Sequence, residues 1–255
     1  MKRISLEEAK FLQYEMLKEI HRYTESHSLT YFLSAGTLLG AVRHQGFIPW
    51  DDDIDIIMPQ PDFEMLMKNY KSDRYQAVWC YNNMEYGYVF GRLYDKRTCF
   101  QMGRYKGLGL YIDIYVIFGA PEAKELQLER FRRAFKYLPR RSRLISLRSK
   151  LVRLGIWPYK TLDFTLLNKA CRRMYEELAR YDYNSSIFVH PYGGGKTIVR
   201  KELYERKLIM PFENDAFFVP ERFDDLLSLT YGNYMQLPPL EKRQAYHDLS
   251  YYYWL

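Results

Sequence analysis

Apolar and polar positions follow one another along this chain in two rhythms, one typical of helices and one typical of strands. In residues 5–26 apolar side chains recur every three or four positions, and Ser5 with Glu8 forms a capping box, so we expect a helix. Further helices are expected at 37–44, 62–70 and 221–230, with two or three between 121 and 181. Short apolar runs predict strands at 29–34, 53–58, 75–81, 87–94, 108–118, 187–190 and 216–219.

Helices flanking a small mixed sheet place the fold in the α/β or α+β class. We expect a core over residues 1–120, an added helical segment over 121–181, and a C-terminal lobe over 182–255 that completes the same domain. The 255 residues are 47% hydrophobic and 27% charged, which supports a buried core and excludes a disordered chain.

Cysteine usage and the N-terminal sequence predict a cytoplasmic protein. Three cysteines without a CxxC pair indicate a reduced compartment and argue against a structural zinc site. Glu7, Glu8 and Lys10 interrupt the stretch where a signal peptide needs apolar residues. The longest apolar run, 108–120, contains Asp113 and is shorter than the roughly 20 residues of a membrane span.

The net charge of +7 is concentrated in one segment. Residues 121–160 hold twelve Lys or Arg and three acidic residues, so the rest of the chain is slightly negative. This distribution fits either a solvated helix face or a surface for an anionic partner, and it argues against a nucleic-acid binder. Within 140–157, leucines at helical spacing lie beside basic residues, which predicts peripheral contact with an anionic membrane or, alternatively, packing on the core or a second subunit.

Four carboxylates within five residues form the most informative cluster: Asp51, Asp52, Asp53 and Asp55. If 53–58 is a strand, Asp53 and Asp55 share one face and the intervening isoleucine points to the core. Adjacent carboxylates repel each other, and a hard divalent cation such as Mg²⁺ or Mn²⁺ relieves that repulsion. Solvated loops and helix N-termini also hold Asp runs, but they do not explain this alternation.

Asp113 and Gly36-Thr37 are the expected partners of this cluster. An ionised Asp113 inside an apolar strand is costly unless it shares a partner, and a metal held with Asp53 and Asp55 would supply one. The alternative is a sheet-end Asp that caps a neighbouring group. We expect a turn at Ala35-Gly36 and a helix opened by Thr37, whose free N–H groups suit a phosphate.

The stretch GTLLGAVRHQGFIPWDDDIDIIMP closely resembles the signature of the LicD family of bacterial phosphocholine transferases, related to fukutin and fukutin-related protein. That family has the nucleotidyltransferase fold, whose Gly-Ser/Thr, D-h-D and distant acid match Gly36-Thr37, Asp53-Ile54-Asp55 and Asp113. The resemblance covers about residues 25–247, including FFVP at 217–220 and YGNYMQLPPLEKR at 231–243, and it finds little to match in 121–181.

The resemblance implies an enzyme that moves an alcohol phosphate from a CDP-activated donor to a sugar hydroxyl and releases CMP. The donor would be CDP-choline, CDP-glycerol or CDP-ribitol. The acceptor would be a cell-surface glycan such as teichoic acid or lipopolysaccharide, or its lipid-linked precursor at the inner face of the plasma membrane. Two metal ions on Asp53, Asp55 and Asp113 would clamp the attacking and leaving oxygens. The family also implies that Asp113, or a metal-bound hydroxide, takes the acceptor proton.

Further residues have weaker assignments. Arg43, His44, Arg92 and Lys96 are expected near the phosphate, and Arg97 is a weaker candidate for the same role. Asp51 and Asp52 would tune the metal site or cap its loop. Lys196 lies in HPYGGGKT, where His190 breaks the P-loop pattern, so a glycine lid, a substrate loop or a plain turn is expected. His247 would contact substrate or lie on the surface.

Two other function classes stay open from the sequence. A nucleotidyltransferase would add NMP from an NTP to a small molecule or protein, and a binding or scaffold relative would have lost the acids that this chain keeps. The 25 tyrosines could provide a cage for choline or could simply fill half-buried sheets.

Overall fold

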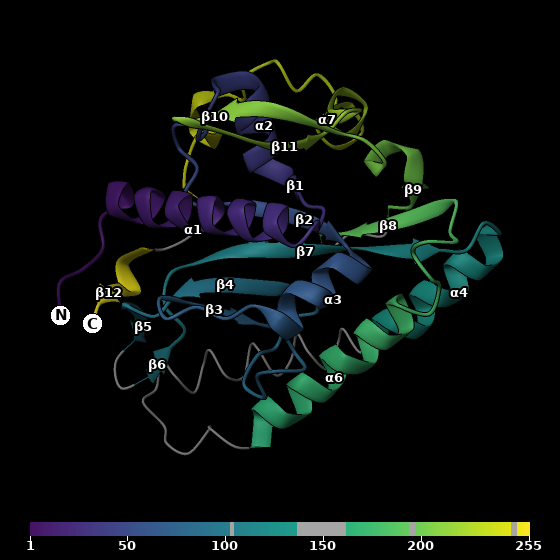
Figure 1. Cartoon of the computed structure of the whole chain (residues 1–255), viewed down its shortest axis with the longest axis horizontal. Coiled ribbons are helices and arrows are strands. Elements are labelled where there is room, and N and C mark those ends of the chain that lie inside the picture. The colour runs from purple at the N-terminus through teal and green to yellow at the C-terminus, as the bar shows by residue number, and fades with distance from the viewer. Residues whose placement is uncertain (103–104, 137–161, 194–196, 246–248) are drawn as a thin grey trace.

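The computed structural model describes residues 1–102, 105–136, 162–193, 197–245 and 249–255, and Figure 1 shows their arrangement. The α-helices among them are α1 (Leu6–Ser26), α2 (Ala35–His44), α3 (Gln60–Asn69), α4 (Lys124–Phe135), α6 (Leu162–Leu178) and α7 (Phe223–Tyr231). Short 3₁₀ helices are η1 (Lys201–Tyr204), η2 (Leu240–Lys242) and η3 (Leu249–Tyr251). The fold is mixed α/β, as the sequence pattern predicted.

The largest sheet is built around one long strand. Its strands are β1 (Phe32–Leu33), β2 (Asp55–Pro59), β7 (Tyr111–Ala120), β4 (Gly91–Asp95) and β3 (Tyr75–Val78), in that order, joined by β8 (Phe188–Tyr192) and β9 (Val199–Arg200). Strand β7 pairs in parallel with β2 on one side, and antiparallel with β4 and then β8 on the other. Residues of the C-terminal part therefore complete the sheet that the first 120 residues begin.

Two smaller sheets lie beside the large one. One is the hairpin of β10 (Lys207–Phe212) and β11 (Asp215–Pro220), and the other joins β12 (Tyr252–Trp254), β5 (Thr98–Met102) and β6 (Tyr105–Gly107). Strand β12 brings the C-terminus next to the N-terminus, as Figure 1 shows, and the Trp254 amide donates to the Lys2 carbonyl at 2.9 Å. The chain ends are thus held on the same side of the molecule.

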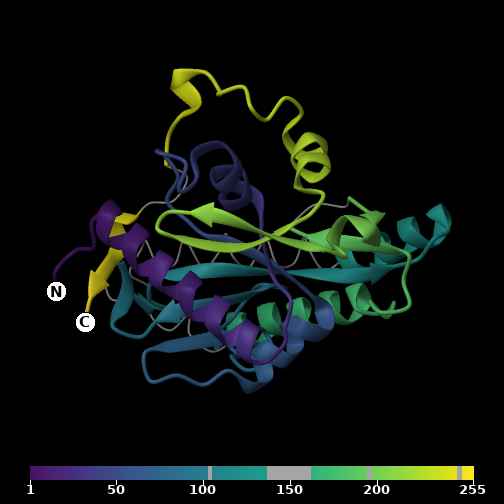
Figure 2. The ribbon, with the colours of Figure 1, turned by 45° about the horizontal axis from the view of Figure 1, so that its top comes forward.

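The two faces of the large sheet have different roles. Alternate residues of β7, such as Ile114 and Phe118, are fully buried in the main core with side chains from α1, α3 and α6. Their neighbours in sequence, Asp113 and Tyr115, point to the opposite face, because side chains alternate along a strand. Figure 2 shows α1 and α3 lying across one side of this sheet. The carboxylates are thereby kept on the face that those helices leave uncovered.

Several predicted elements are confirmed and several are displaced. Helix α1 has the expected capping box between Ser5 and Glu8, and strands or helices form near each of the other expected positions. The expected turn at Ala35-Gly36 is wrong, because α2 begins at Ala35 with Ser34 in the N-cap position. Strand β2 begins only at Asp55, and β5, β6, β9, β10 and β12 had no counterpart in the sequence interpretation.

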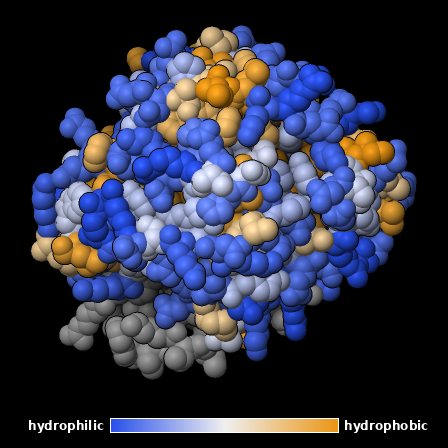
Figure 3. Space-filling model, in the orientation of Figure 1, coloured by the Kyte–Doolittle hydropathy of each residue, from blue (hydrophilic) through white to orange (hydrophobic). Residues whose placement is uncertain are grey.

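Among the helices in the described part of the chain, none combines the length and apolar character needed to cross a bilayer. The face in Figure 3 is mostly hydrophilic, with an apolar patch near its top; exposed apolar side chains in the β10 and α7 region include Ile209 and Leu229. The basic 140–157 segment lies outside the described residues.

Candidate active site

Two carboxylates lie side by side on neighbouring parallel strands. Asp55 is the first residue of β2, and its register partner on β7 is Asp113. Both are buried, with 8% and 7% of their surface exposed. Folding alone does not favour two adjacent buried acids, because burial and mutual repulsion both penalise the ionised forms. The pair expected from the sequence is therefore a real feature of the fold.

Arg92 on β4 is the second register partner of Asp113. Its Nε donates to Asp113 Oδ1 at 2.6 Å, and its guanidinium lies 3.6 Å from the ring centroid of Tyr111 and 4.5 Å from that of Tyr88. Burial acts to lower the pKa of Arg92, but the charge of Asp113 outweighs it and holds that pKa well above its ordinary value. Arg92 thus fixes the position of the Asp113 side chain.

Asp55 is only partly satisfied by its surroundings. Its backbone amide donates to Thr37 Oγ1 at 2.8 Å, which fixes the start of β2 against α2. Its carboxylate atom Oδ1 is buried and has no hydrogen-bond partner among the described residues. Burial raises the pKa of Asp55 well above its ordinary value, and the neighbouring carboxylates, Asp53 first, raise it further. Within the described residues this oxygen is thus a buried acceptor that no donor satisfies.

Asp51, Asp52 and Asp53 precede β2 and form a second group of acids. One carboxylate oxygen from each lies within 4.8 Å of the others. Because Asp53 lies before the strand begins, the strand alternation proposed for Asp53 and Asp55 does not apply. Asp53 nevertheless lies close enough to raise the pKa of Asp55, so the two side chains still converge.

Asp51 and Asp52 are positioned by groups from the two neighbouring helices. A side-chain carbon added to Gly36 in α2 would lie 2.6 Å from Asp51 Oδ2, so only glycine permits this approach. Burial raises the pKa of Asp51, while a hydrogen bond with Asp53 lowers it. Gln13 of α1 donates to the Asp52 carbonyl at 3.1 Å, and Asp52 is 1% exposed. The acid-rich segment is consequently held between α1 and the first turn of α2.

Two tyrosines lie close to the carboxylates, and one of them, Tyr231, was not anticipated as a site residue. Tyr115 follows Asp113 on the same face of β7, and burial together with Asp55 and Asp113 raises its pKa. Tyr231 ends α7, and burial together with the charges of Asp55, Asp51 and Asp53 raises its pKa to about 12. The only sequence signal for Tyr231 was its place at the start of YGNYMQLPP.

The remaining predicted site residues are dispersed. Arg43 and His44 lie in the last turn of α2, at the opposite end from Gly36; Arg43 donates to His44 Nε2 and to the Tyr234 carbonyl. Lys96 follows the far end of β4 and donates to the Ser72 carbonyl at 2.9 Å. Lys96 is thus directed away from the carboxylates, whereas the charge of Arg43 acts on Tyr231, one of the two tyrosines beside them. Arg97 pairs with Asp95 instead of a site group, and Lys196 and His247 lie outside the described residues.

The donor set fits a divalent cation. Asp53 and Asp113 both lie near enough to Asp55 for their charges to raise its pKa, and the unpartnered buried Asp55 oxygen is the atom that a hard cation would satisfy. A cation there would neutralise the repulsion that raises the pKa of Asp55. Such a site, with a nearby helix N-terminus at Gly36-Thr37, is suited to handling a phosphate group.

Comparison with known proteins finds similarity over the residues that carry these acids. Residues 28–137 match the family model described as LicD/FKTN/FKRP, nucleotidyltransferase domain. The chain is 26% identical to the lipopolysaccharide cholinephosphotransferase LicD of Haemophilus influenzae over 97% of both chains. An uncharacterized protein of Rickettsia typhi is 39% identical over 80 residues, which is 30% of this chain and 26% of that protein. The protein carries a LicD family domain, and its acid-rich site lies within the matched residues.

Proposed function

We propose that this protein transfers phosphocholine from CDP-choline to a sugar hydroxyl of a glycan and releases CMP. The observation that carries the proposal is the buried Asp55–Asp113 pair with one unpartnered carboxylate oxygen. The full-length relative in Haemophilus influenzae, by its name a lipopolysaccharide cholinephosphotransferase, supports both the phosphocholine group and a glycan acceptor. A cell-surface glycan or its lipid-linked precursor is the acceptor that we infer.

We assign Asp53, Asp55 and Asp113 to hold Mg²⁺ or Mn²⁺, as one or two ions. When bound, the metal would neutralise charge on the phosphates that separate during transfer. Arg92 donates to Asp113 Oδ1 at 2.6 Å and so fixes the carboxylate that would hold the metal. Asp113 is therefore a ligand in this proposal.

The N-terminus of α2 is the proposed binding place for the donor phosphate. Ala35, Gly36 and Thr37 form its first turn, whose backbone N–H groups lack partners within the helix. Gly36 approaches Asp51, and Thr37 contacts the Asp55 amide, so this turn borders the carboxylates directly. A phosphate placed here would lie between the positive end of the helix and the metal ligands.

Thermal unfolding with matched ligands tests the proposal. CDP-choline, CDP-glycerol, CDP-ribitol, CTP and ATP are each added with Mg²⁺ or with EDTA to the wild type, to Asp55→Asn and to Asp73→Asn, an exposed control. Ligand at 100 times Kd stabilises by about 2.7 kcal/mol, which raises Tm by several degrees. We expect a Mg²⁺-dependent shift with CDP-choline that Asp55→Asn loses and Asp73→Asn keeps.

Product analysis separates the neighbouring chemistries. CMP and phosphocholine-labelled glycan should form together from CDP-choline. A shift with CDP-glycerol or CDP-ribitol alone would change the donor within the same reaction. Pyrophosphate release from CTP or ATP, without use of any CDP-alcohol, would instead make the protein a nucleotidyltransferase, the activity that the matched family description also names.

A further inference from the structure

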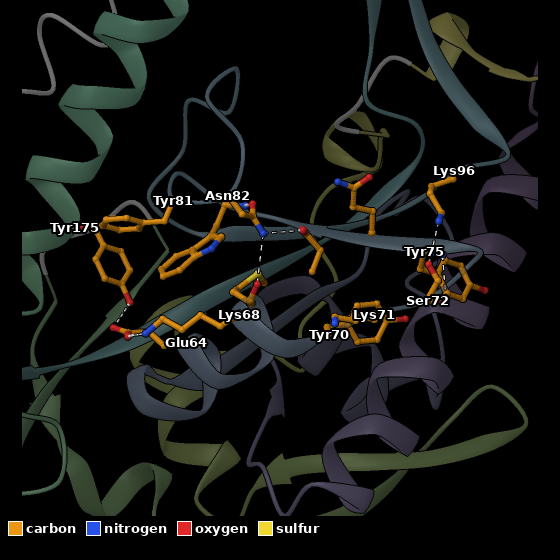
Figure 4. Close-up of a pocket in the computed structure, with 14 residues that line it drawn as sticks. Glu64, Lys68, Tyr70, Lys71, Ser72, Tyr75, Tyr81, Asn82, Lys96 and Tyr175 are labelled. Atoms are coloured by element: carbon orange, nitrogen blue, oxygen red, sulfur yellow. Dashed lines mark hydrogen bonds and ion pairs between the residues drawn. The ribbon is translucent and has the colours of Figure 1, made fainter.

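A groove of about 770 Å³ lies at the edge strand β3, outside the site described above. Strand β3, the segment after it, α3 and α6 form its walls, as Figure 4 shows. Val78 is the register partner of Arg92, so Val78 and Arg92 share the carboxylate face, while Tyr75 and Ala77 point to the other face. The groove therefore lies along the edge of the sheet, lined by Tyr75 and Ala77 from the face away from Asp55 and Asp113 and by Gln76 from the other face.

Aromatic side chains occupy one end and part of the floor of this groove. Trp79, Tyr81 and Tyr175 form a contiguous group, with ring centroids 4.7 Å apart for Trp79 and Tyr81 and 5.5 Å apart for Trp79 and Tyr175. Tyr81 is the exposed member, at 39%. Its hydroxyl hydrogen-bonds to Glu176 at 3.2 Å, so the ring is held in a fixed orientation. An oriented, partly exposed ring can stack on an apolar face of a ligand.

Lysines lie in the middle and at the other end. Figure 4 places Lys71 and Lys96 near Tyr70 and Tyr75, away from Tyr81 and Asn82. Lys68 pairs with Glu64 at 2.6 Å. Lys71 and Lys96 are exposed, and no carboxylate among the residues that line the groove pairs with either of them. Lys96 keeps its ammonium near the groove by donating to the Ser72 carbonyl. The groove thus combines an aromatic end with a basic end.

Polar groups between these ends can hydrogen-bond a ligand. Gln76 is an exposed amide on β3, and Asn82 lines the groove while its own Nδ2 donates to the Ala77 carbonyl at 3.1 Å. Sugars match this combination, because a pyranose ring has an apolar C–H face and a rim of hydroxyls. A phosphate on the same oligosaccharide would complement the lysines through charge-assisted hydrogen bonds. The volume lies in the range of ligand-binding clefts.

We propose that this groove is an exosite for a phosphorylated oligosaccharide, with a sugar ring on Tyr81 and the phosphate at Lys71 and Lys96. The identification of that oligosaccharide as a part of the acceptor glycan rests on the proposed function. The exosite holds the glycan away from the reacting centre, so it contributes to binding of long acceptors and not to the transfer step.

Binding of a defined sugar tests the exosite independently of catalysis. The probe is a pentasaccharide bearing one phosphate monoester, compared with the same pentasaccharide after phosphatase treatment, titrated by calorimetry without CDP-choline. We expect removal of the phosphate, or Lys71→Glu with Lys96→Glu, to weaken binding at least about tenfold, and Tyr81→Ala to weaken it similarly. Lys169→Glu is the matched control, because Lys169 is exposed on α6 but does not line the groove.

The outcomes separate this inference from the proposed function. Asp55→Asn should abolish transfer and leave pentasaccharide binding unchanged, whereas the groove variants should leave transfer to a short neutral acceptor unchanged. Equal binding by the groove variants and the wild type would overturn the exosite, as would equal binding of both pentasaccharides. Tighter binding of CMP than of the phosphorylated sugar, lost in the groove variants, would reassign the groove to a nucleotide.

Discussion

Arg92 and Asp113 face each other across β4 and β7, and their ion pair, 2.6 Å long, has both side chains largely shielded from water at 14% and 9% exposure. Three aromatic rings, those of Tyr88, Phe90 and Tyr111, lie within 6 Å of the guanidinium. A buried charge is tolerated only while its partner is present. The two residues therefore act as one structural unit, on which the orientation of the candidate metal ligand depends.

Removal of one member of this unit should destabilise the protein more than removal of both. Arg92→Met leaves Asp113 buried without its cation, and we expect a loss of about 3–5 kcal/mol in the free energy of unfolding. The double variant Arg92→Met/Asp113→Leu replaces both charges with apolar groups and should recover most of that loss. Urea unfolding of the four members of this double-mutant cycle measures the coupling.

The exposed pair of Lys68 and Glu64 provides the comparison. Its lysine is 58% exposed, so the same cycle with Lys68→Met and Glu64→Leu should give a coupling below about 1 kcal/mol. If the coupling energy between Arg92 and Asp113 is as small as that of the exposed pair, the two residues do not act as one structural unit.

Asp55→Asn should stabilise the metal-free protein. The raised pKa of Asp55 means that its ionised form is less favourable in the folded chain than in the unfolded chain. A neutral amide removes that cost, and we expect a gain on the order of 1 kcal/mol at neutral pH, or about 2–4 °C in Tm. Calorimetry in EDTA measures it. A lower Tm than the wild type in EDTA would show that the ionised carboxylate is needed for folding.

Asp95 should make the protein sensitive to acid. It is fully buried; burial acts to raise its pKa, but hydrogen bonds from Arg97 and Arg74 outweigh burial and hold the pKa below its ordinary value. A lowered folded pKa stabilises the protein above the unfolded value, near 3.9, and that contribution is lost as the pH falls through the folded value. Stability should therefore decline more steeply below about pH 4 than in a variant lacking this carboxylate.

Melting curves between pH 3 and pH 7 on the wild type and Asp95→Asn measure this dependence. At pH 7 the free energy of unfolding of the variant should be about 1–3 kcal/mol below that of the wild type. This loss is moderate because water screens the partly exposed Arg74 and Arg97, and at pH 3 the two proteins should be nearly equal in stability. The exposed Asp73→Asn is the control and should follow the wild type throughout. Parallel curves for wild type and Asp95→Asn would refute the assignment.

The local sequence predicted features that depend on neighbouring residues in the chain. The capping box at Ser5 and Glu8 and the acid inside the apolar run at Asp113 are such features, and both are present in the structure. The predicted start of the strand at residue 53 was wrong, because β2 begins at Asp55. The DIDI pattern continues the strand alternation without showing where pairing starts.

Features that depend on strand register could not be predicted in this way. Arg92 pairs with Asp113 because β4 lies antiparallel to β7 in one particular register, 21 positions away along the chain. Lys96, only four residues later, is carried to the far end of the same strand by that register. Likewise, β12 completes a sheet with β5, which no pattern at the C-terminus indicated.

Glu213 connects the β10–β11 turn to the loop that leads into the acids. Its Oε1 accepts a hydrogen bond from the Phe47 amide at 2.9 Å, and its own amide donates to the Gln45 carbonyl at 2.8 Å. The same oxygen would lie 2.3 Å from a side-chain carbon added to Gly46. This contact fixes residues 45–47, and the chain reaches Asp51 four residues later.

Glu213→Ala removes the side-chain contact while keeping the backbone bond, so the loop should loosen and the fold should survive. Small misplacements of reacting groups reduce rates by up to about 10²-fold, and we expect kcat for CMP release to fall by at least about tenfold with a small change in Tm. Glu213→Gln retains an acceptor oxygen for the Phe47 amide and should keep most of the rate. If Glu213→Gln loses as much activity as Glu213→Ala, the charge of Glu213 matters and not its hydrogen bond; if neither variant loses activity, the loop is fixed by other contacts.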